Sequence, residues 1–302
     1  MMQKVRFKGI MPALITPFDS NGKVKTATVK KMIDDLLDVG VSGFYVAGGT
    51  GEGVLLNVAQ RKVVAEAAIE ANAGRGKVII HTGSINSDEV MELTRHATTA
   101  GADGISSVLP SIYFSYTMDE LVDFYRKMAD NTDLPILVYA NHTGNGVDVN
   151  KMIERLLPIE NIAGAKDTRG NYFKMWELKQ LNNGNINVIN GPDDTLLCGL
   201  LIGADGGIGT SYGLMPEWFV ELYDKFQRGD LSGAKQAQDR INRVLSVLFA
   251  WSEGNIIRPA KESLRLSGYD AGCATYPAQE YSRDKLAKFK SEMEAAGYVY
   301  PR

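Results

Sequence analysis

Ile162-Ala163-Gly164-Ala165-Lys166-Asp167-Thr168 places a single lysine at the end of a short apolar run. Such a run predicts a strand that is buried on both faces. Apolar surroundings disfavour the charged form of an ammonium group, and a neutral amine can attack a carbonyl carbon to form a Schiff base. The alternative is that Lys166 only marks the end of the strand and extends its ammonium into solvent.

Apolar runs of this kind alternate with amphipathic segments along most of the chain. Eight short runs, from residues 9–15 to Gly206–Gly209, are each followed by a segment with helical spacing of apolar residues, such as Thr26–Val39. This alternation predicts a parallel sheet covered by helices, and eight such units predict an α/β fold of the (β/α)8 or TIM-barrel type. We therefore expect a barrel over residues 1–228 and a C-terminal helical bundle over residues 229–302.

The composition excludes several classes of function. The chain has 302 residues, 44% of them hydrophobic, and a net charge of −3 with acidic and basic residues interleaved, which disfavours a nucleic-acid partner. The two cysteines lie far apart and the three histidines lack ligand spacing, so we expect neither a disulfide framework nor a metal. No run of about 18 apolar residues and no signal-like segment in residues 1–7 occurs, so we expect no membrane contact and a cytoplasmic location.

The residues that follow the predicted strands are expected to meet. Active sites of such barrels lie at the C-terminal ends of the strands. Taken singly, Tyr139 could be a surface aromatic residue and Asp193 a helix N-cap. Together, a lysine nucleophile, a phenol on the adjacent strand that can shuttle protons and a glycine-rich anion nest with a threonine indicate a site for a 2-keto acid. The residues expected at this rim are Gly49, Thr50, Tyr113, Tyr139, Lys166, Gly191, Asp193, Asp194 and Thr210.

The glycine-rich stretches were compared with nucleotide-binding motifs. Neither residues 48–53 nor residues 206–210 fit G-x-G-x-x-G, and no G-K-[S/T] occurs. Dinucleotide and P-loop functions are therefore not predicted.

Six motifs extend essentially from end to end of the chain. They are GIMPALITPF (9–18), GGTGE (48–52), Val138-Tyr139, GAKDT (164–168), NGPDD (190–194) and GADGGIGTSY (203–212). With them the chain resembles the dihydrodipicolinate synthase and N-acetylneuraminate lyase superfamily of class I, pyruvate-dependent aldolases. The resemblance implies that Lys166 is the Schiff-base lysine, that Tyr139 shuttles protons, and that Thr50 with the amides of Gly49 and Thr50 holds the pyruvate carboxylate. It also implies that Tyr113 contributes near the site, that the covalent adduct needs no cofactor, and that the protein is a homotetramer.

The same resemblance bears on the substrate. GADGGIGTSY is similar to the N-acetylneuraminate lyase branch, and the synthase branch carries an arginine shortly after the strand-five tyrosine, which residues 140–145 lack. Dihydrodipicolinate synthase activity is therefore disfavoured. The expected partners are pyruvate and a sugar acid. The residues implied to contact the sugar acid are Thr168, Gly191, Asp193, Asp194, Ile208 and Thr210.

Two positions depart from the family pattern. Gly49 stands where a serine or threonine is usual, and Asn141 and His142 follow Tyr139 in place of asparagine, an apolar residue and proline. Arg169 adds a cation near the rim, either for a substrate carboxylate or as a solvated surface residue. The open alternatives are a 2-keto-3-deoxy sugar acid aldolase or dehydratase and, in a different class, a non-catalytic barrel that binds a keto acid reversibly.

Overall fold

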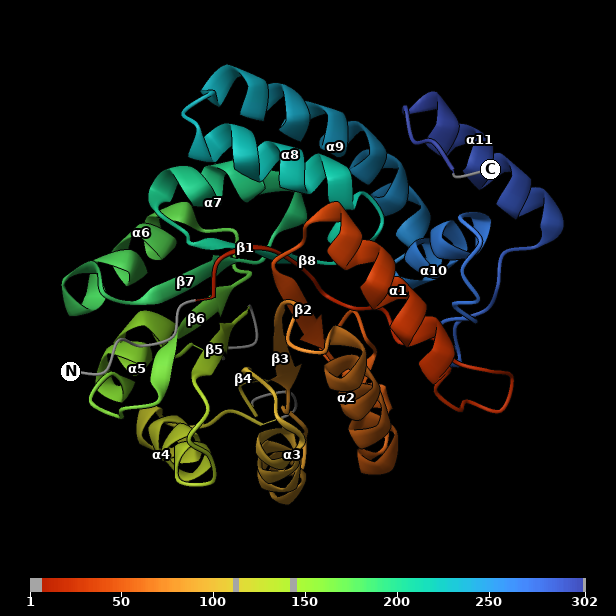
Figure 1. Ribbon diagram of the computed structural model, residues 1–302. Helices are drawn as coiled ribbons and strands as arrows, with labels where there is room; N and C mark the ends of the chain where they lie inside the picture. The colour runs from red at the N-terminus through yellow and green to blue at the C-terminus, as the bar shows by residue number, and fades with distance from the viewer. Residues whose placement is uncertain (1–6, 111–113, 142–145, 301–302) are drawn as a thin grey trace.

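The computed structural model describes residues 7–110, 114–141 and 146–300 (Figure 1). Its strands form one parallel sheet in the order β1-β8-β7-β6-β5-β4-β3-β2. A parallel bridge between Ala13 and Tyr45 joins the first strand to the second and closes the sheet. The predicted (β/α)8 barrel is confirmed. The strands are β1 (Gly9–Pro12), β2 (Gly43–Val46), β3 (Lys77–His81), β4 (Gly104–Val108), β5 (Ile136–Ala140), β6 (Ile162–Asp167), β7 (Asn187–Asn190) and β8 (Gly206–Gly209).

Helices alternate with the strands and form the outer ring of the barrel (Figure 1). Local signals set their ends: Asn57 and Gln60 form a capping box at the start of one helix, and Gly40 ends another in a left-handed conformation. The helix predicted from Asp193 begins instead as a short 3₁₀ turn at Asp193–Thr195. The ring consists of α1 (Thr26–Val39), α2 (Val58–Asn72), α3 (Ser87–Ala100), α4 (Met118–Ala129), α5 (Val149–Leu156), α6 (Tyr172–Gln180), α7 (Leu196–Ile202) and α8 (Pro216–Gln227).

Two separate apolar cores stabilise this arrangement. The larger core lies between the sheet and the helices. The smaller one fills the barrel interior, because side chains of successive strand residues point alternately inward and outward. Its members come from seven of the strands and their flanks: Phe7, Met11, Ala13, Tyr45, Ile79, Leu137, Ala163, Ile189 and Ile208.

Three further helices follow the barrel: α9 (Leu231–Ser252), α10 (Ile257–Leu266) and α11 (Arg283–Ala295). Figure 1 shows α9 running alongside α8, while α10 and α11 lie beyond it at the C-terminal end of the chain. The helical bundle predicted after the barrel is confirmed, whereas the division into domains at residue 228 stays a prediction. Over the described ranges, no helix is long and apolar enough to cross a membrane.

A buried ion pair joins this C-terminal part to the barrel. Lys261 in α10 lies 2.7 Å from Glu52, and the two side chains are 1% and 4% exposed. The second carboxylate oxygen of Glu52 accepts a hydrogen bond from the backbone N–H of Thr275 at 2.6 Å. Glu52 belongs to the GGTGE motif after β2, so the C-terminal helices pack directly against a loop at the rim of the barrel.

Candidate active site

A β-bulge in β6 determines where the lysine points. Ile136 pairs with Ile162 but Leu137 pairs with Gly164, so β6 contains one extra residue at this place. Ala163 belongs to the interior core and Ala165 to the outer core, which turns Lys166 inward and Asp167 outward. A Cβ atom at Gly164 would lie 1.8 Å from the carbonyl oxygen of Asn187. The glycine is therefore required for the bulge to fit against β7.

Lys166 is buried at the C-terminal end of the barrel interior, with 6% of the residue exposed. Its amino nitrogen lies 4.4 Å from the ring centre of Tyr45 and 4.3 Å from that of Tyr139. The alternative that this lysine extends into solvent is wrong. A buried amine between two aromatic faces is instead accessible only from the pocket beside it.

Tyr139 on β5 is paired in register with Lys166 on β6. The charge of the Lys166 ammonium lowers the pKa of Tyr139, and the nearby Thr168 hydroxyl acts in the same direction. A phenol with a lowered pKa beside an amine can accept and return a proton within one site.

Two aromatic residues that the sequence did not single out complete this cluster. The rings of Tyr45 and His81 lie 6.4 and 6.2 Å from the ring of Tyr139, and the Tyr45 hydroxyl donates to Ser106 at 3.1 Å. Burial, together with the nearby Arg61 guanidinium, holds the pKa of His81 well below its usual range. His81 is therefore neutral, and its Nε2 accepts a hydrogen bond from the backbone N–H of Val108.

The loop after β2 meets the end of β8 across the pocket. The hydroxyls of Thr50 and Thr210 are 2.6 Å apart. A Cβ atom placed on Gly49 would meet nothing within 4 Å. Hydroxyl and amide donors thus gather at this end, beside an open space at residue 49.

The loop after β7 supplies a half-buried carboxyl group. One oxygen of Asp193 accepts hydrogen bonds from the backbone N–H and the hydroxyl of Ser211, at 2.7 and 2.5 Å. Burial raises the pKa of Asp193, and these hydrogen bonds oppose that rise. Gly209 leaves room for it, since a Cβ there would lie 2.1 Å from the other carboxyl oxygen. The predicted N-cap role of Asp193 is not seen, because its carboxyl caps neither the 3₁₀ turn nor α7.

One pocket, with a volume of about 90 Å³, contains most of the predicted site residues. Ala13, Tyr45 and Gly209 line it without having been predicted. Ala13 and Gly209 lie within the motifs 9–18 and 203–212, but neither carries a functional group that would single it out, and Tyr45 lies in an ordinary apolar strand. The predicted residues in its lining are Gly49, Thr50, Tyr139, Lys166, Thr168, Gly191, Asp193, Ile208 and Thr210.

The remaining candidates have different outcomes. Asp194 is not part of the lining, and its backbone oxygen accepts a hydrogen bond from Asn242. Tyr113 and His142 lie outside the described residues. Arg169 is neither solvated nor in the pocket, because its guanidinium is paired with the buried Asp167. Both sequence interpretations of that arginine are wrong.

In the described part of the chain, no three histidine, cysteine, aspartate or glutamate side chains gather as a metal site would require. The groups that line the pocket are an amine, phenols, hydroxyls, backbone amides and the single carboxyl of Asp193. These groups suit covalent imine chemistry with an anionic carbonyl compound.

An amine buried under two tyrosines, at the C-terminal mouth of a (β/α)8 barrel, is suited to the Schiff-base chemistry of a class I aldolase. The family match and the similar proteins that follow place the chain among the pyruvate-dependent lyases of this class. The sequence profile of the dihydrodipicolinate synthetase family matches residues 6–296, and the chain belongs to that family.

Similar proteins agree with this assignment. N-acetylneuraminate lyase 2 of Escherichia coli O6:H1 is 34% identical over 244 residues, which are 80% of this chain and 79% of that protein. The structure of Proteus mirabilis N-acetylneuraminate lyase matches with a TM-score of 0.91 at 27% identity, covering 98% of this chain and 100% of the other. YagE, a prophage protein of the dihydrodipicolinic acid synthase family from E. coli K12, was solved in complex with pyruvate. It matches with a TM-score of 0.91 at 28% identity, covering 98% and 100% of the two chains.

Proposed function

We propose that this protein cleaves N-acetylneuraminate to N-acetylmannosamine and pyruvate through a Schiff base on Lys166. The observation that carries the proposal is the Lys166 amine, buried against the Tyr45 and Tyr139 rings at the end of a pocket. The names of the similar lyases support the choice of sugar acid.

In the proposed reaction, Lys166 attacks C2 of the open-chain keto acid, and loss of water gives an iminium. The C3–C4 bond then breaks, its electron pair moves into the iminium to form an enamine, and Tyr139 takes the proton of the C4 hydroxyl. Protonation of the enamine at C3 and hydrolysis release pyruvate and regenerate the amine. The iminium is the electron sink, so the proposed reaction uses no metal and no other cofactor.

The two ends of the pocket suit the two ends of such a substrate. Thr50, with the amides of Gly49 and Thr50, would hold the keto-acid carboxylate. The hydroxylated chain would extend past the loops after β6, β7 and β8, where hydroxyl and carboxyl groups accept and donate hydrogen bonds. The residues proposed for that contact are Thr168, Gly191, Asp193, Asp194, Ile208 and Thr210.

The glycine at residue 49 favours a second candidate function. Without a hydroxyl at residue 49, the carboxylate end has one donor fewer and more open space than a serine would leave. An aldolase for a different 2-keto-3-deoxy sugar acid would fit this change. Lys166 is the one cationic side chain in the described pocket lining, so a substrate with a second carboxylate is disfavoured.

We also propose that the protein is a cytoplasmic homotetramer. Three large apolar side chains on the neighbouring helices α6 and α7 support an assembly, because Phe173, Trp176 and Leu201 are 66%, 47% and 57% exposed. Sedimentation equilibrium measures the assembly, and a monomeric protein at micromolar concentration would contradict it.

The test of the proposed function is reductive trapping. The protein is incubated with pyruvate and borohydride, and peptide mass locates the adduct, which is expected on Lys166 and absent from folded Lys166→Ala. A panel of sugar acids then identifies the substrate by its products, with N-acetylmannosamine expected. A folded protein that forms no adduct would indicate a barrel that binds its keto acid without covalent chemistry.

A further inference from the structure

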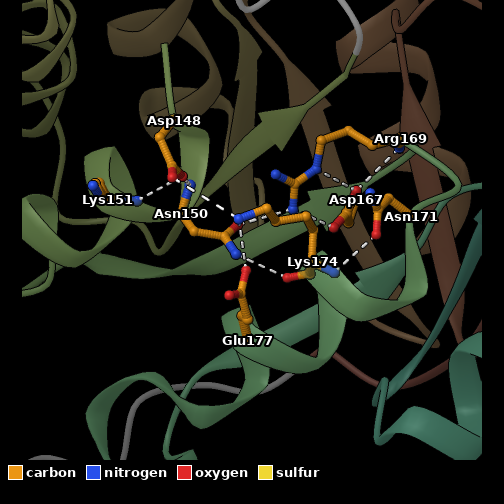
Figure 2. A network of polar contacts seen from close by, with 8 residues as sticks. All are labelled: Asp148, Asn150, Lys151, Asp167, Arg169, Asn171, Lys174 and Glu177. Atoms are coloured by element: carbon orange, nitrogen blue, oxygen red, sulfur yellow. Dashed lines mark hydrogen bonds and ion pairs between the residues drawn. The ribbon is translucent and has the colours of Figure 1, made fainter.

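A buried ion pair, Asp167–Arg169, lies at the end of β6, next in the sequence to Lys166 (Figure 2). Asp167 separates Lys166 from Thr168 in the sequence, and its side chain is fully buried. The backbone N–H and Nε of Arg169 donate to Oδ1 of Asp167 at 3.0 and 2.9 Å, and Nη2 donates to Oδ2 at 2.6 Å. A guanidinium that binds both oxygens fixes the orientation of a carboxylate as well as its charge.

The ion pair is anchored to the two helices that flank this strand. Nη2 of Arg169 also donates to the side-chain oxygen of Asn150 in α5 at 3.0 Å. The amide nitrogen of Asn150 donates to the backbone oxygen of Lys174 in α6 at 2.8 Å. Asp148 and Asn171 cap these two helices, and Figure 2 shows both in the same network of polar contacts as Asn150 and the Asp167–Arg169 pair. The position of Asp167 is thus set by α5 and α6.

The same end of β6 is also hydrogen-bonded through its backbone to both neighbouring strands. The backbone N–H of Thr168 donates to the oxygen of Ala140 at 2.8 Å, and that of Gly191 donates to the oxygen of Asp167 at 2.8 Å. Space is tight here, because a Cβ on Gly191 would lie 2.0 Å from the Thr168 hydroxyl. A shift of Asp167 would therefore move Thr168 within the pocket.

We propose that the Asp167–Arg169 ion pair is a positioning device, which keeps the Lys166 amine and the Thr168 hydroxyl aligned with Tyr139. Arg169 acts from behind the strand and touches no reacting atom. This inference rests on the proposed Schiff-base reaction. Misalignment of reacting groups lowers the rate of the chemical step more than it lowers binding, so loss of the pair should affect kcat more than KM.

The main variant is Arg169→Met, and the chain offers a matched control. Lys179 and Asp205 form a second ion pair that is largely shielded from solvent, with side chains 16% and 18% exposed. The corresponding values for Arg169 and Asp167 are 13% and 0%. Asp205 lies just before β8, at the opposite end of the barrel from the pocket. Lys179→Met therefore removes a comparable pair without disturbing the site.

We expect folded Arg169→Met to lose about 10- to 100-fold in kcat, less than the roughly 10²- to 10⁴-fold that a general acid–base group contributes, with KM changed less than about threefold. Lys179→Met should keep kcat within about threefold of the wild type, and Arg169→Lys, which keeps the charge but loses the two-point contact, should recover part of the loss. The Lys166 ammonium and the Thr168 hydroxyl lower the pKa of Tyr139. Tyr139 accepts a proton in the proposed step, so the rise of kcat that accompanies loss of its phenol proton should move to higher pH in Arg169→Met.

Arg169→Met leaves the buried Asp167 carboxylate unpaired, and this can prevent folding. In that case the double variant Asp167→Asn/Arg169→Met, which buries no unpaired charge, is measured in its place and the same loss is expected. An unchanged kcat and pH profile in either folded variant would overturn the proposal, as would an equal loss in Lys179→Met. Borohydride trapping of pyruvate on the wild-type protein tests the Schiff base alone. A pyruvyl adduct on wild-type Lys166 together with an unchanged kcat in the variants would overturn only the role of the ion pair. A wild-type protein that forms no adduct would instead overturn the proposed function.

Discussion

Replacing Lys261 tests how strongly the C-terminal helices hold the loop after β2. The Lys261→Met change would leave Glu52 buried without its cation, because both side chains are less than 5% exposed and the second Glu52 oxygen is bonded only to a backbone N–H. Removing one partner of a buried ion pair costs about 3–5 kcal/mol. Glu52 also adopts a left-handed backbone conformation, with φ of 56°, which costs about 1 kcal/mol or more and depends on the surrounding contacts.

The assay is urea denaturation of the wild type, Lys261→Met and a control, Lys235→Met. Lys235 pairs with Asp239 on the surface of α9, where the side chains are 70% and 52% exposed, so the control should lose less than about 1 kcal/mol. The KM for the keto acid should also rise in Lys261→Met, because Thr50 lies two residues before Glu52 in the same loop. A loss of stability below about 1 kcal/mol in Lys261→Met would refute the reasoning, since it would show that the buried charge is compensated elsewhere.

Three further changes probe the site and the core. Tyr139→Phe should lower kcat by about 10²- to 10⁴-fold while imine trapping on Lys166 persists; complete loss of trapping would make the phenol essential for imine formation instead. Gly49→Ser fits without a clash and adds a donor to a charged carboxylate, so KM for pyruvate should fall about tenfold; an unchanged KM would place the carboxylate elsewhere. Burial raises the pKa of Glu262 in the folded protein above its value in the unfolded chain. The protonated carboxyl therefore stabilises the folded state fully at pH values below the unfolded pKa, and this contribution is lost as the pH rises through the folded pKa. Glu262→Gln should therefore gain stability relative to the wild type as the pH rises above about 4, the usual pKa of a glutamate, and parallel curves of stability against pH would contradict this.

The barrel could be predicted because its strands are buried on both faces. Such strands are nearly continuous apolar runs, and the helices between them keep a separate periodicity, so eight repeats are visible without any contact information. The rim residues followed from the same count, since each lies just after a predicted strand. Tyr45 could not be found in this way, because Gly43–Val46 is uniformly buried and nothing in the sequence shows that its tyrosine meets a lysine.

The bulge in β6 and the partner of Arg169 were equally invisible in the sequence. If the side chains of β6 alternated regularly between inward and outward from Ala163, Lys166 would point outward, toward the helices. The pairing register of β6 against β5 shows one extra residue, and this residue turns Lys166 inward. Arg169 is two residues from Asp167, a spacing that by itself does not distinguish an ion pair from two solvated side chains. Its pairing depends on Asn150, which is near in space but far in sequence.

The aromatic surroundings of Lys166 explain how one site can hold both an amine and an iminium. A carboxylate beside the lysine would stabilise its ammonium form and suppress the nucleophile, and within the described chain no carboxylate lies within 4 Å of that nitrogen as an ion-pair partner. The nearest rim carboxyl, that of Asp193, is engaged by Ser211 instead. Two aromatic faces attract a cation more weakly than a carboxylate does. The Tyr45 and Tyr139 rings therefore leave the free amine accessible and still stabilise the iminium, which carries its positive charge at the same nitrogen.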